Sequence, residues 1–316
     1  MKNVAITGIN GFIGGVVAQH FLDHHYTVKG CGSQQSPVNA DQNIDFIQGR
    51  FQDEAVAARL LENTDTLIHC AGMIHLYYGL NEEVYQVNCK DTIALAEQAI
   101  ENQVQHFIYI SSIHAFEEGL EEVTLEAPFE KDHQVAYNFS KASAVEKLRE
   151  LFESTQTRLT IIYPTAVLGI HNYTGTSMMK LLDLADQMPV LVLPNAYFDV
   201  VDVDDVAESL VNIVNETTEG EYIIGGHRTS MKKIAGTYLN QKSNKKMIFT
   251  VPVTLLIHVA HIFEVLRIKS EFSLYNMKTL KYGTETSVKH QTEKILDRSP
   301  TDIEKIIAKI IAWKSH

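Results

Sequence analysis

Cysteine is scarce in this sequence, and the cysteines that are present do not form a pattern typical of disulfide bonds. There are three, Cys31, Cys70 and Cys89, and each lies in an apolar run where a thiol usually behaves as a small hydrophobic side chain. An odd number at these positions excludes a disulfide framework. We therefore expect a reducing, cytoplasmic setting.

Positive charge is also in short supply. The chain has 27 lysines and arginines against 39 aspartates and glutamates, which gives a formal net charge of −12 at pH 7. A surface of this sign repels nucleic acids and anionic membranes, although it leaves room for a local basic pocket that binds one small phosphorylated ligand. We predict neither a nucleic-acid partner nor a membrane partner.

Long hydrophobic runs are missing as well. The most apolar window, residues 251–266, contains a proline, two histidines and Glu264, and it is shorter than the roughly 20 residues that a membrane span needs. The first residues lead directly into a short β-branched run, with no apolar stretch ending at a cleavage site, so we expect no signal peptide. The apolar window is better explained as an amphipathic helix that covers a pocket.

What the sequence does contain is an alternation of short β-branched runs with longer stretches of helical spacing. At 316 residues, 45% of them hydrophobic, the chain can bury a large core. The predicted strands are residues 4–6, 27–31, 44–47, 66–70, 106–110 and 160–163. Such an alternation is typical of an α/β fold with a doubly wound parallel sheet and helices on both faces.

The second half of the chain is less regular, which predicts a smaller lobe interleaved with the sheet domain. We assign residues 1–168 to the sheet domain, with residues 197–225 returning to it, and residues 169–196 and 226–316 mainly to the smaller C-terminal lobe. The chain closes with an amphipathic helix after Pro300, and the run from Thr301 to Glu304 predicts a side-chain cap at its start.

A glycine-rich turn follows the first predicted strand. Gly8, Gly11 and Gly14 are spaced three residues apart and open a helical pattern that includes Phe12 and Ile13. Glycines permit a tight turn and the close approach of a pyrophosphate, and the helix N-terminus then presents free N–H groups and a positive dipole end to that anion. The position of the motif between a strand and a helix predicts a dinucleotide-binding site.

Three other residues form a pattern suited to proton transfer. Tyr137 and Lys141 are four residues apart in a helical stretch, so both side chains project from one face, and Ser112 stands at the carboxyl end of the fifth predicted strand. A tyrosine with its ordinary pKa of about 10 exchanges protons poorly at neutral pH, and a neighbouring ammonium group stabilises the tyrosinate. Ser112 can then hydrogen-bond a substrate oxygen while Tyr137 transfers the proton. A Tyr-x-x-x-Lys pair alone is also typical of two solvent-facing side chains on a helix, and its value here comes from the upstream serine and the glycine motif at suitable distances.

Together these motifs resemble those of the extended short-chain dehydrogenases/reductases, the NAD-dependent epimerase/dehydratase family. The matching segments are Thr7–Gly14 (TGINGFIG), Leu67–Gly72, Val87–Asn88 with Thr92, Ile110–Ser112, Tyr137–Lys141, Pro164–Gly169 and Val203–Ala207. They follow the family's order across essentially the whole chain, and the pattern is most similar to the branch of dihydroflavonol reductases and 3β-hydroxysteroid dehydrogenases. The resemblance implies a Rossmann fold and an NAD(P)-dependent enzyme.

The resemblance also implies roles for individual residues. The catalytic residues would be Ser112, Tyr137, Lys141 and Asn88, with Lys141 bound to the nicotinamide ribose and Asn88 supporting it through a water. The cofactor-binding residues would be Gly8, Asn10, Gly11, Phe12, Ile13, Gly14, Ser33, Arg50, Phe51, Cys70, Ala71, Gly72, Ser111, Tyr137, Lys141, Pro164 and Val167.

The choice between NADP and NAD depends on the residues after the second and third strands. In the family an acidic residue after the second strand binds the ribose of NAD and a basic residue favours NADP, but residues 30–34 read Gly-Cys-Gly-Ser-Gln. After the third strand the usual Gly-Asp is replaced by Gly49-Arg50. Because no carboxylate repels a 2′-phosphate, and Arg50 and Ser33 could bind one, the sequence favours NADP. The alternative is an Arg50 that is solvated or stacks on adenine.

The reaction type follows from departures within the family. Dehydratases of the family place an Asp-Glu pair after the catalytic Ser or Thr, whereas residues 113–115 read Ile-His-Ala, which disfavours dehydration. Nucleotide-sugar enzymes commonly show Arg-Pro-x-Asn where residues 163–166 read Tyr-Pro-Thr-Ala, which disfavours a nucleotide-sugar substrate. The apolar residues of the predicted lobe are Met178, Met179, Leu181, Leu182, Leu184, Val253, Leu255, Leu256 and Phe263. We therefore expect reduction of a carbonyl, or oxidation of a secondary alcohol, in a small and largely apolar substrate.

Two other functions stay open. One is a nucleotide-sugar epimerase, and the other is a non-catalytic, NADP-sensing regulator, which the presence of both Tyr137 and Lys141 disfavours. The fourteen histidines lack the spacing of zinc ligands, so we predict no metal. A small carbonyl or alcohol is the expected partner, and a homodimer is a further option.

Overall fold

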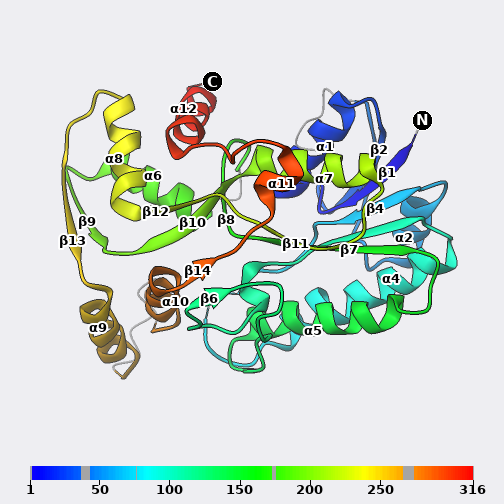
Figure 1. Cartoon of the computed structure of the whole chain (residues 1–316), viewed down its shortest axis with the longest axis horizontal. Helices are drawn as coiled ribbons and strands as arrows, with labels where there is room; N and C mark the ends of the chain where they lie inside the picture. The colour runs from blue at the N-terminus through cyan, green and yellow to red at the C-terminus, as the bar shows by residue number, and fades with distance from the viewer. Residues whose placement is uncertain (1, 37–42, 76, 173–175, 266–273, 316) are drawn as a thin grey trace.

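The computed structural model describes residues 2–36, 43–75, 77–172, 176–265 and 274–315. Its centre is a seven-stranded sheet in which all neighbouring strands are parallel, in the order β11-β7-β5-β4-β1-β2-β3 (Figure 1). The strands are β1 (Asn3–Thr7), β2 (Thr27–Gly32), β3 (Ile44–Gln48), β4 (Thr66–His69), β5 (His106–Ile110), β7 (Arg158–Pro164) and β11 (Gly220–Ile224). The six strands predicted from the sequence are all present, and the predicted doubly wound α/β fold is confirmed.

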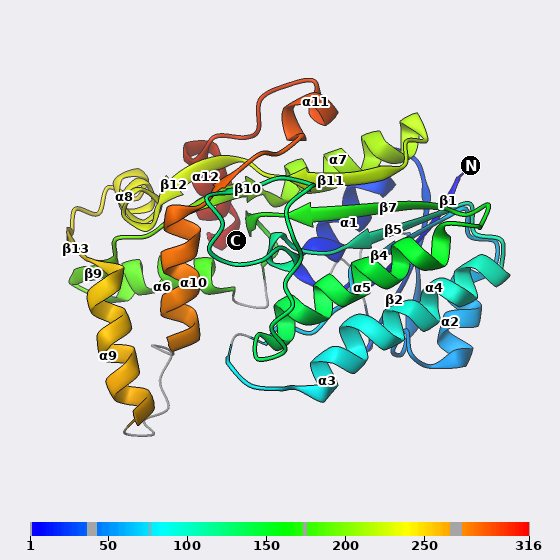
Figure 2. The same ribbon diagram turned by 60° about the horizontal axis from the view of Figure 1, so that its bottom comes forward.

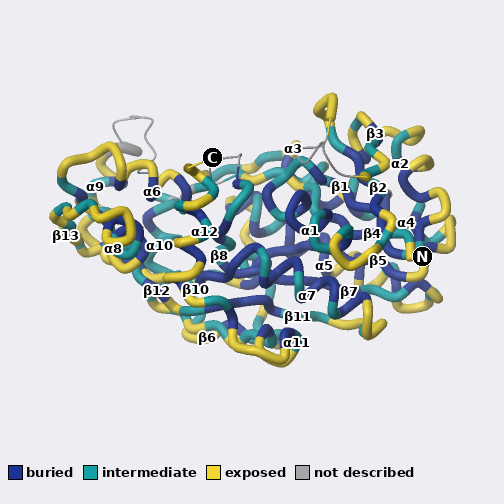
Figure 3. The backbone as a smooth tube through the Cα atoms, turned by 90° about the horizontal axis from the view of Figure 1, so that it is seen from above, coloured by how far each residue is buried: buried dark blue, intermediate teal, exposed yellow. Residues whose placement is uncertain are grey.

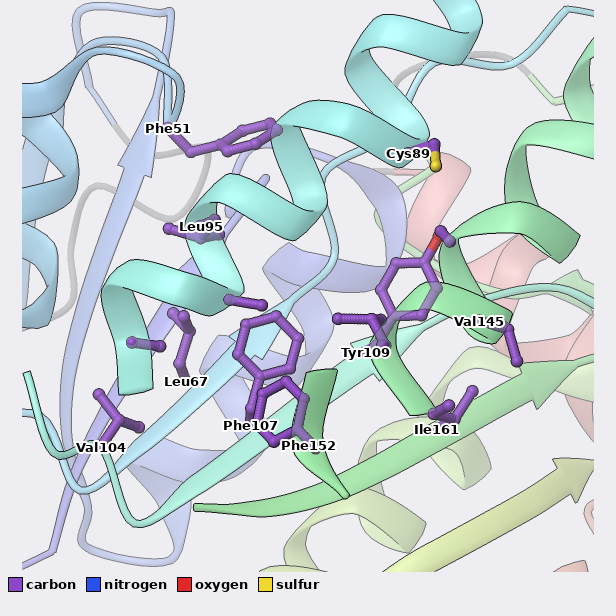
Figure 4. Close-up of a cluster of buried hydrophobic side chains, with 14 of the residues drawn as sticks. Phe51, Leu67, Cys89, Leu95, Val104, Phe107, Tyr109, Val145, Phe152 and Ile161 are labelled. Atoms are coloured by element: carbon purple, nitrogen blue, oxygen red, sulfur yellow. The ribbon is translucent and has the colours of Figure 1, made fainter. Parts of the chain in front are cut away.

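Helices cover both faces of this sheet (Figure 1). On one face lie α1 (Phe12–Asp23) and α7 (Val203–Glu216), and on the other α2 (Glu54–Leu61), α4 (Asp91–Glu101) and α5 (Ala136–Phe152). Each face has its own hydrophobic core, because successive strand side chains point to opposite sides. Figure 4 shows the core beneath α4 and α5, where the rings of Phe107 and Phe152 lie 5.4 Å apart.

The remaining elements form smaller sheets and a third core. The strands β8 (Ala166–Leu168), β10 (Tyr197–Asp202) and β12 (His227–Ser230) make a three-stranded sheet, and β9 (Val190–Pro194) pairs in parallel with β13 (Met247–Val251). The helices α6 (Ser177–Gln187), α8 (Met231–Gln241) and α12 (Ile303–Lys314) pack around a cluster of buried aliphatic side chains. Figure 3 shows buried backbone concentrated in the central sheet and exposed backbone towards β13 and α8.

The helix pair α9 (Val253–Val265) and α10 (Leu274–Glu285) lies at the end of the molecule far from the N-terminus (Figure 2). The short strand β14 (Ser287–Val288) follows α10 and pairs with β6 (Glu122–Val123), which ties this part of the chain to the segment after β5. In the described ranges, no helix combines the length and the apolar character that crossing a membrane requires.

The segment 197–225 divides between the two sheet systems. Its last strand, β11, joins the central sheet and α7 packs against α1, but β10 pairs with β8 and β12 instead. The division of the chain into domains at residues 168, 196 and 225 therefore stays a proposal.

The C-terminal helix is held in a different way from the one predicted. Asp302 is the N-cap residue of α12, but its side chain makes no capping hydrogen bond. Thr301 instead donates its backbone N–H and its hydroxyl to the two carboxylate oxygens of the fully buried Asp205 in α7, at 2.6 and 2.8 Å. Arg298 donates to the same carboxylate at 2.8 Å. Because Asp205 is 93 residues or more distant in the sequence, a local capping pattern could not predict it.

Candidate active site

The glycine turn after β1 lies directly against the residues that follow β4. Gly8 has a φ of +67°, a left-handed conformation that a side chain would strain, and a Cβ there would lie 2.8 Å from the backbone nitrogen of Ala71. Gly11 is the N-cap of α1 and offers no side-chain cap, so the first N–H groups of the helix are left for an anion. The predicted phosphate cradle is therefore sterically consistent with a dinucleotide.

Four other predicted cofactor residues surround this turn with different degrees of burial. Phe12 is buried in the core beneath α1, and Ile13 and Cys70 pack against the same cluster. Burial raises the pKa of the Cys70 thiol to about 12, so it stays protonated. Asn10 lies over the end of β2, where Gly32 leaves room for its amide, and donates to the Ser36 carbonyl at 3.3 Å. These residues shape the turn and its surroundings.

The sequence did not reveal a hydrogen-bonded chain beneath the turn. Ala71 donates its N–H to Thr7 Oγ1 (3.2 Å), Thr7 lies 2.7 Å from Nδ1 of His69, and Nε2 of His69 lies 3.0 Å from Thr92 Oγ1. Burial lowers the pKa of His69 to about 3, so the ring is neutral. The Thr92 hydroxyl donates to the Val87 carbonyl at 3.4 Å, so it accepts from Nε2–H of the neutral ring, and Nδ1 therefore accepts from the Thr7 hydroxyl. This series of hydrogen bonds joins β1, β4 and α4 beneath the glycine turn.

At the adenosine end, the predicted residues lie in contrasting environments. Ser33 and Arg50 are exposed, and the Asp53 carboxylate accepts the backbone N–H of Arg50 at 3.2 Å. Phe51 is instead buried in the core, where its ring meets that of His69 edge-on at 4.8 Å. Ser33 and Arg50 are thus accessible to a phosphate, while Phe51 supports the site from below.

The catalytic serine and tyrosine predicted from the sequence are brought together. Ser112 follows β5 and begins a single 3₁₀ turn, η2 (Ile113–Ala115), in which its Oγ accepts the N–H of His114 at 3.2 Å. Tyr137 lies in the first turn of α5. Burial raises the pKa of Tyr137, and a hydrogen bond with Ser112 acts in the opposite direction. The tyrosine therefore keeps its proton at neutral pH, and its raised pKa differs from the lowering that we expected from the neighbouring ammonium group.

Lys141 lies one turn further along α5 and is almost completely buried. Its Nζ donates to the Ile110 carbonyl at 3.0 Å and lies 4.7 Å above the ring of Tyr109. Burial lowers its pKa from 10.5 to about 8. A Cβ on Gly72 would come within 3.4 Å of this Nζ, so the glycine keeps the space beside the ammonium group open.

Asn88, which the resemblance matches to a structural or catalytic asparagine, joins two segments through its side-chain amide. It lies in a π-helical turn, η1 (Gln86–Lys90), between α3 (Glu82–Tyr85) and α4. Its Oδ1 accepts the N–H of Met73 (2.7 Å), and its Nδ2 donates to the Met73 carbonyl (2.8 Å) and to Ser140 Oγ (3.0 Å). Both amide hydrogens are used, so Asn88 fastens the segment after β4 to α5. Its support of Lys141 through a water stays a prediction.

Two buried hydroxyl groups near these residues lack a partner among the described atoms. Ser111 follows β5 and Thr165 follows β7, the neighbouring strand, and the oxygens Ser111 Oγ and Thr165 Oγ1 accept or donate no hydrogen bond in the described part of the chain. Pro164 ends β7, and Val167 lies in β8 and packs against the core under α1. Unpaired buried hydroxyls are costly, and a bound ligand would relieve that cost. They fit a nicotinamide group held at the ends of these strands.

No three histidine, cysteine, aspartate or glutamate side chains converge as a metal site in the ranges that the structure covers.

The fold and the site together define an NAD-dependent enzyme of the extended short-chain dehydrogenase/reductase type. Residues 4–225 match the model of the NAD dependent epimerase/dehydratase family, and the chain belongs to this family.

Curated relatives of the chain have different activities. A UDP-glucose 4-epimerase of Vibrio cholerae is 28% identical over 68% of this chain and 67% of its own length. The sterol demethylase protein B of Methylococcus capsulatus is 21% identical over 98% of this chain and 97% of its own length. A sterol-4-alpha-carboxylate 3-dehydrogenase of Dictyostelium discoideum is 25% identical over 51% of this chain and 52% of its own length.

Solved structures agree with the fold. The UDP-glucose 4-epimerase of Bifidobacterium longum, in complex with NAD+ and UDP, superposes with a TM-score of 0.76 at 17% identity, over 99% of this chain and 98% of its own. Such low identity shows a shared fold and leaves the reaction to be argued from the site.

Proposed function

We propose that the protein is an oxidoreductase that reduces a carbonyl, or oxidises a secondary alcohol, in a small and largely apolar substrate. The observation that carries this proposal is that Tyr137 lies beside Ser112, just after β5, and one helical turn before the buried Lys141. A bound reduced nicotinamide supplies the hydride. Ser112 donates a hydrogen bond to the carbonyl oxygen, and Tyr137 transfers its proton to that oxygen as the alcohol forms.

Lys141 stabilises the tyrosinate that remains and binds the ribose hydroxyls. Its buried ammonium group has one protein acceptor in the described chain, the Ile110 carbonyl, and it can donate up to three hydrogen bonds. The remaining hydrogens are therefore suited to hydroxyl groups of a ligand.

Support for an apolar substrate comes from a different place than the one predicted. Met179, Leu181 and Leu182 of α6 are buried in the core of the smaller lobe, so they do not line a substrate site. Residues 74–75 and 77–80, however, follow Met73, which Asn88 holds, and Gly79 forms a β-bridge with Val135, the residue before α5. The side chains of Ile74, Tyr77 and Leu80 are exposed large hydrophobic groups.

Gly72, two residues before Ile74, lies beside Lys141, and Gly79 is bridged to the residue before α5, so we propose that these apolar side chains contribute to the substrate surface. Burying such side chains against a ligand is favourable by roughly 25 cal/mol per Å². The relatives named for sterols agree with this choice of substrate.

For the cofactor we favour NADP, since Ser33 and Arg50 are exposed at the ends of β2 and β3 and residues 30–34 carry no carboxylate. Thermal unfolding in the presence of NADPH or NADH at equal concentration tests this, because the tighter ligand raises the midpoint further. Arg50→Gln should reduce the effect of NADPH and leave that of NADH unchanged. A larger effect of NADH on the wild type would overturn the preference.

The function itself is tested by assaying aromatic and aliphatic aldehydes and ketones for loss of reduced nicotinamide. Tyr137→Phe should bind the cofactor as the wild type does and lose roughly 10²- to 10⁴-fold in turnover, because the ionisable hydroxyl alone is removed. A variant that keeps its turnover would rule out the assigned proton donor.

The epimerase remains a second candidate because of the likeness to the Vibrio cholerae enzyme. A parallel panel of nucleotide sugars, analysed for epimers without net change in the cofactor, distinguishes it. Tight dinucleotide binding without turnover on either panel would favour the regulator.

A further inference from the structure

Exposed large hydrophobic side chains are concentrated in the smaller lobe. Apart from the residues between 74 and 80, those that the described chain exposes are Leu184, Met188, Val192, Tyr197, Met247, Phe249, Leu255 and Ile262. Among the described residues, the helices that cover the central sheet contribute none. Single exposed hydrophobic residues are common, but a group of them at one end of a molecule indicates an interaction surface.

The strand pair β9 and β13 has one apolar face that no other described element covers. Leu191 and Leu193 of β9 point into the core of the smaller lobe, whereas Val192 between them is 60% exposed. Phe249 of β13 pairs directly with Val192 and is 53% exposed, and Met247, two residues earlier on the same face, is 62% exposed. We call Val192, Met247 and Phe249 the outer face.

The helix α9 continues this apolar surface. Pro252 connects β13 directly to α9, so Leu255 lies in the turn next to the strand pair. Leu255 and Ile262 are seven residues apart, which places them on one side of the helix, and both are exposed. Figure 2 shows β9, β13 and α9 together at the end of the molecule far from the N-terminus. The outer face and the exposed side of α9 thus belong to the same end.

This end is basic, although the chain as a whole is acidic. Aspartate and glutamate make up 39 of the 316 residues, yet none occurs in residues 222–263, which contain six lysines and arginines. This stretch spans β12, α8, β13 and most of α9. At 0.1 M ionic strength charges are screened over about 10 Å, so a surface that touches this end interacts mainly with the local lysines and little with the acidic residues of the sheet domain.

The lysines beside the outer face exceed the acidic groups that face them. Lys242 forms an ion pair with Asp186 of α6 at 2.7 Å. Lys246 donates to the backbone carbonyls of Ala185 and Asp186, at 2.7 and 2.8 Å, and Lys245 is exposed two residues before Met247. Two further ion pairs join acids of α6 and α12 to lysines, Asp183 to Lys314 and Glu304 to Lys233. Positive charge therefore remains next to the apolar residues.

We propose that the outer face, the exposed side of α9 and Lys245 form a docking surface for an anionic lipid bilayer, on which the protein lies without crossing it. Apolar side chains flanked by lysines suit the boundary between headgroups and acyl chains, where the lysines meet lipid phosphates. A two-fold dimer through this face would instead bring two basic surfaces together. Our expectation of no membrane partner followed from the net charge, which does not describe this end of the molecule.

Flotation of the full-length protein with lipid vesicles tests the proposal. We expect binding to an equal mixture of phosphatidylcholine and phosphatidylserine, weaker binding to phosphatidylcholine alone, and release at high salt. Phe249→Gln should lower the affinity for mixed vesicles at least about tenfold, because the buried apolar area is lost, and Phe249→Leu should keep most of it. Both changes are at an exposed position, and circular dichroism checks that the variants are folded.

The charge is tested with matched lysine variants. Lys245→Gln should lower the affinity for mixed vesicles about fivefold and leave that for phosphatidylcholine unchanged, since a lysine near an anionic surface contributes on this scale. Lys147→Gln removes an equal charge at an exposed position of α5, in the sheet domain, and should bind as the wild type does.

Several outcomes would overturn the docking surface. They are no flotation with mixed vesicles, equal affinity of Phe249→Gln and the wild type, and equal losses in Lys245→Gln and Lys147→Gln. A dimer in sedimentation velocity that Phe249→Gln abolishes would assign the face to a second copy of the chain instead. The assay does not use the active site, so its failure leaves the proposed redox function in place, and inactivity on the carbonyl panel leaves the docking surface in place.

Discussion

Replacing Gly14 with alanine tests whether the close packing of α1 against the turn is what builds the dinucleotide site. A Cβ at this position would lie 2.9 Å from the carbonyl carbon of Gly8 and closer still to its oxygen, whereas ordinary contact begins at 3.4 Å. Both neighbours are backbone atoms, so the helix must move away by about half an ångström or more. Such overpacking costs about 1–3 kcal/mol.

Gly15→Ala is the matched control. Its Cβ would lie 3.3 Å from the Ile9 carbonyl oxygen, a contact that needs a shift of a tenth of an ångström. Both substitutions gain similar helix propensity, about 1 kcal/mol, so the difference between them isolates the clash. We expect Gly14→Ala to unfold at lower urea concentration than Gly15→Ala.

Dinucleotide binding by isothermal titration is the second readout. The pyrophosphate depends on the position of the first turn of α1, so Gly14→Ala should lose at least about tenfold in affinity, since small misplacements at such sites are costly. Gly15→Ala should bind as the wild type does. Equal stability and equal affinity in the two variants would refute the assignment of the turn as the cofactor cradle.

Two further predictions concern charged groups. Burial lowers the pKa of Lys141 from 10.5 to about 8, so between these pH values the folded protein binds fewer protons than the unfolded chain, and the cost of burying the cation, full below pH 8, is relieved as the pH rises to 10.5. In urea titrations the free energy of unfolding of Lys141→Met, relative to the wild type, should therefore fall by on the order of 3 kcal/mol from pH 8 to pH 10.5. The absence of this trend would refute the burial of the ammonium group. Asp205→Ala should lower the free energy of unfolding by about 1–3 kcal/mol, because Thr301 and Arg298 lose their hydrogen-bond acceptor. Limited proteolysis should then release α12, and a C-terminus as protected as that of the wild type would contradict the role of Asp205.

Local patterns in the sequence were sufficient to predict the central sheet and the family. The runs at 4–6, 66–70 and 106–110 became β1, β4 and β5 because each is β-branched or aromatic and fully enclosed between two layers of helix. The glycine turn and the Tyr137–Lys141 pair could be recognised because each is a motif with short, fixed spacing, and their roles in binding and catalysis stay proposals.

Contacts between distant segments could not be predicted in this way. Thr7 and His69 are 62 residues apart, and nothing in either segment indicates that a hydroxyl of β1 faces an imidazole of β4. The apolar stripe of α6 was assigned to a substrate site, but a stripe at helical spacing is equally suited to core packing, and Leu182 is fully buried there. Asn88 was matched to its motif, but its partner Met73 depends on a π-helical turn without a sequence signature.

Several buried polar groups that lower the stability of the fold lie at the same edge of the central sheet. At the carboxyl ends of β5 and β7 the chain buries the ammonium group of Lys141 and leaves the hydroxyls of Ser111 and Thr165 without a partner among the described residues. Each is costly in the ligand-free protein. A ligand that forms hydrogen bonds to these atoms through hydroxyl and amide groups removes this destabilisation when it binds. Relief of the destabilisation therefore contributes to the free energy of binding. Ser111 precedes Ser112, and Lys141 lies one helical turn after Tyr137, so a ligand bound to these groups would also be held next to the proposed proton donor.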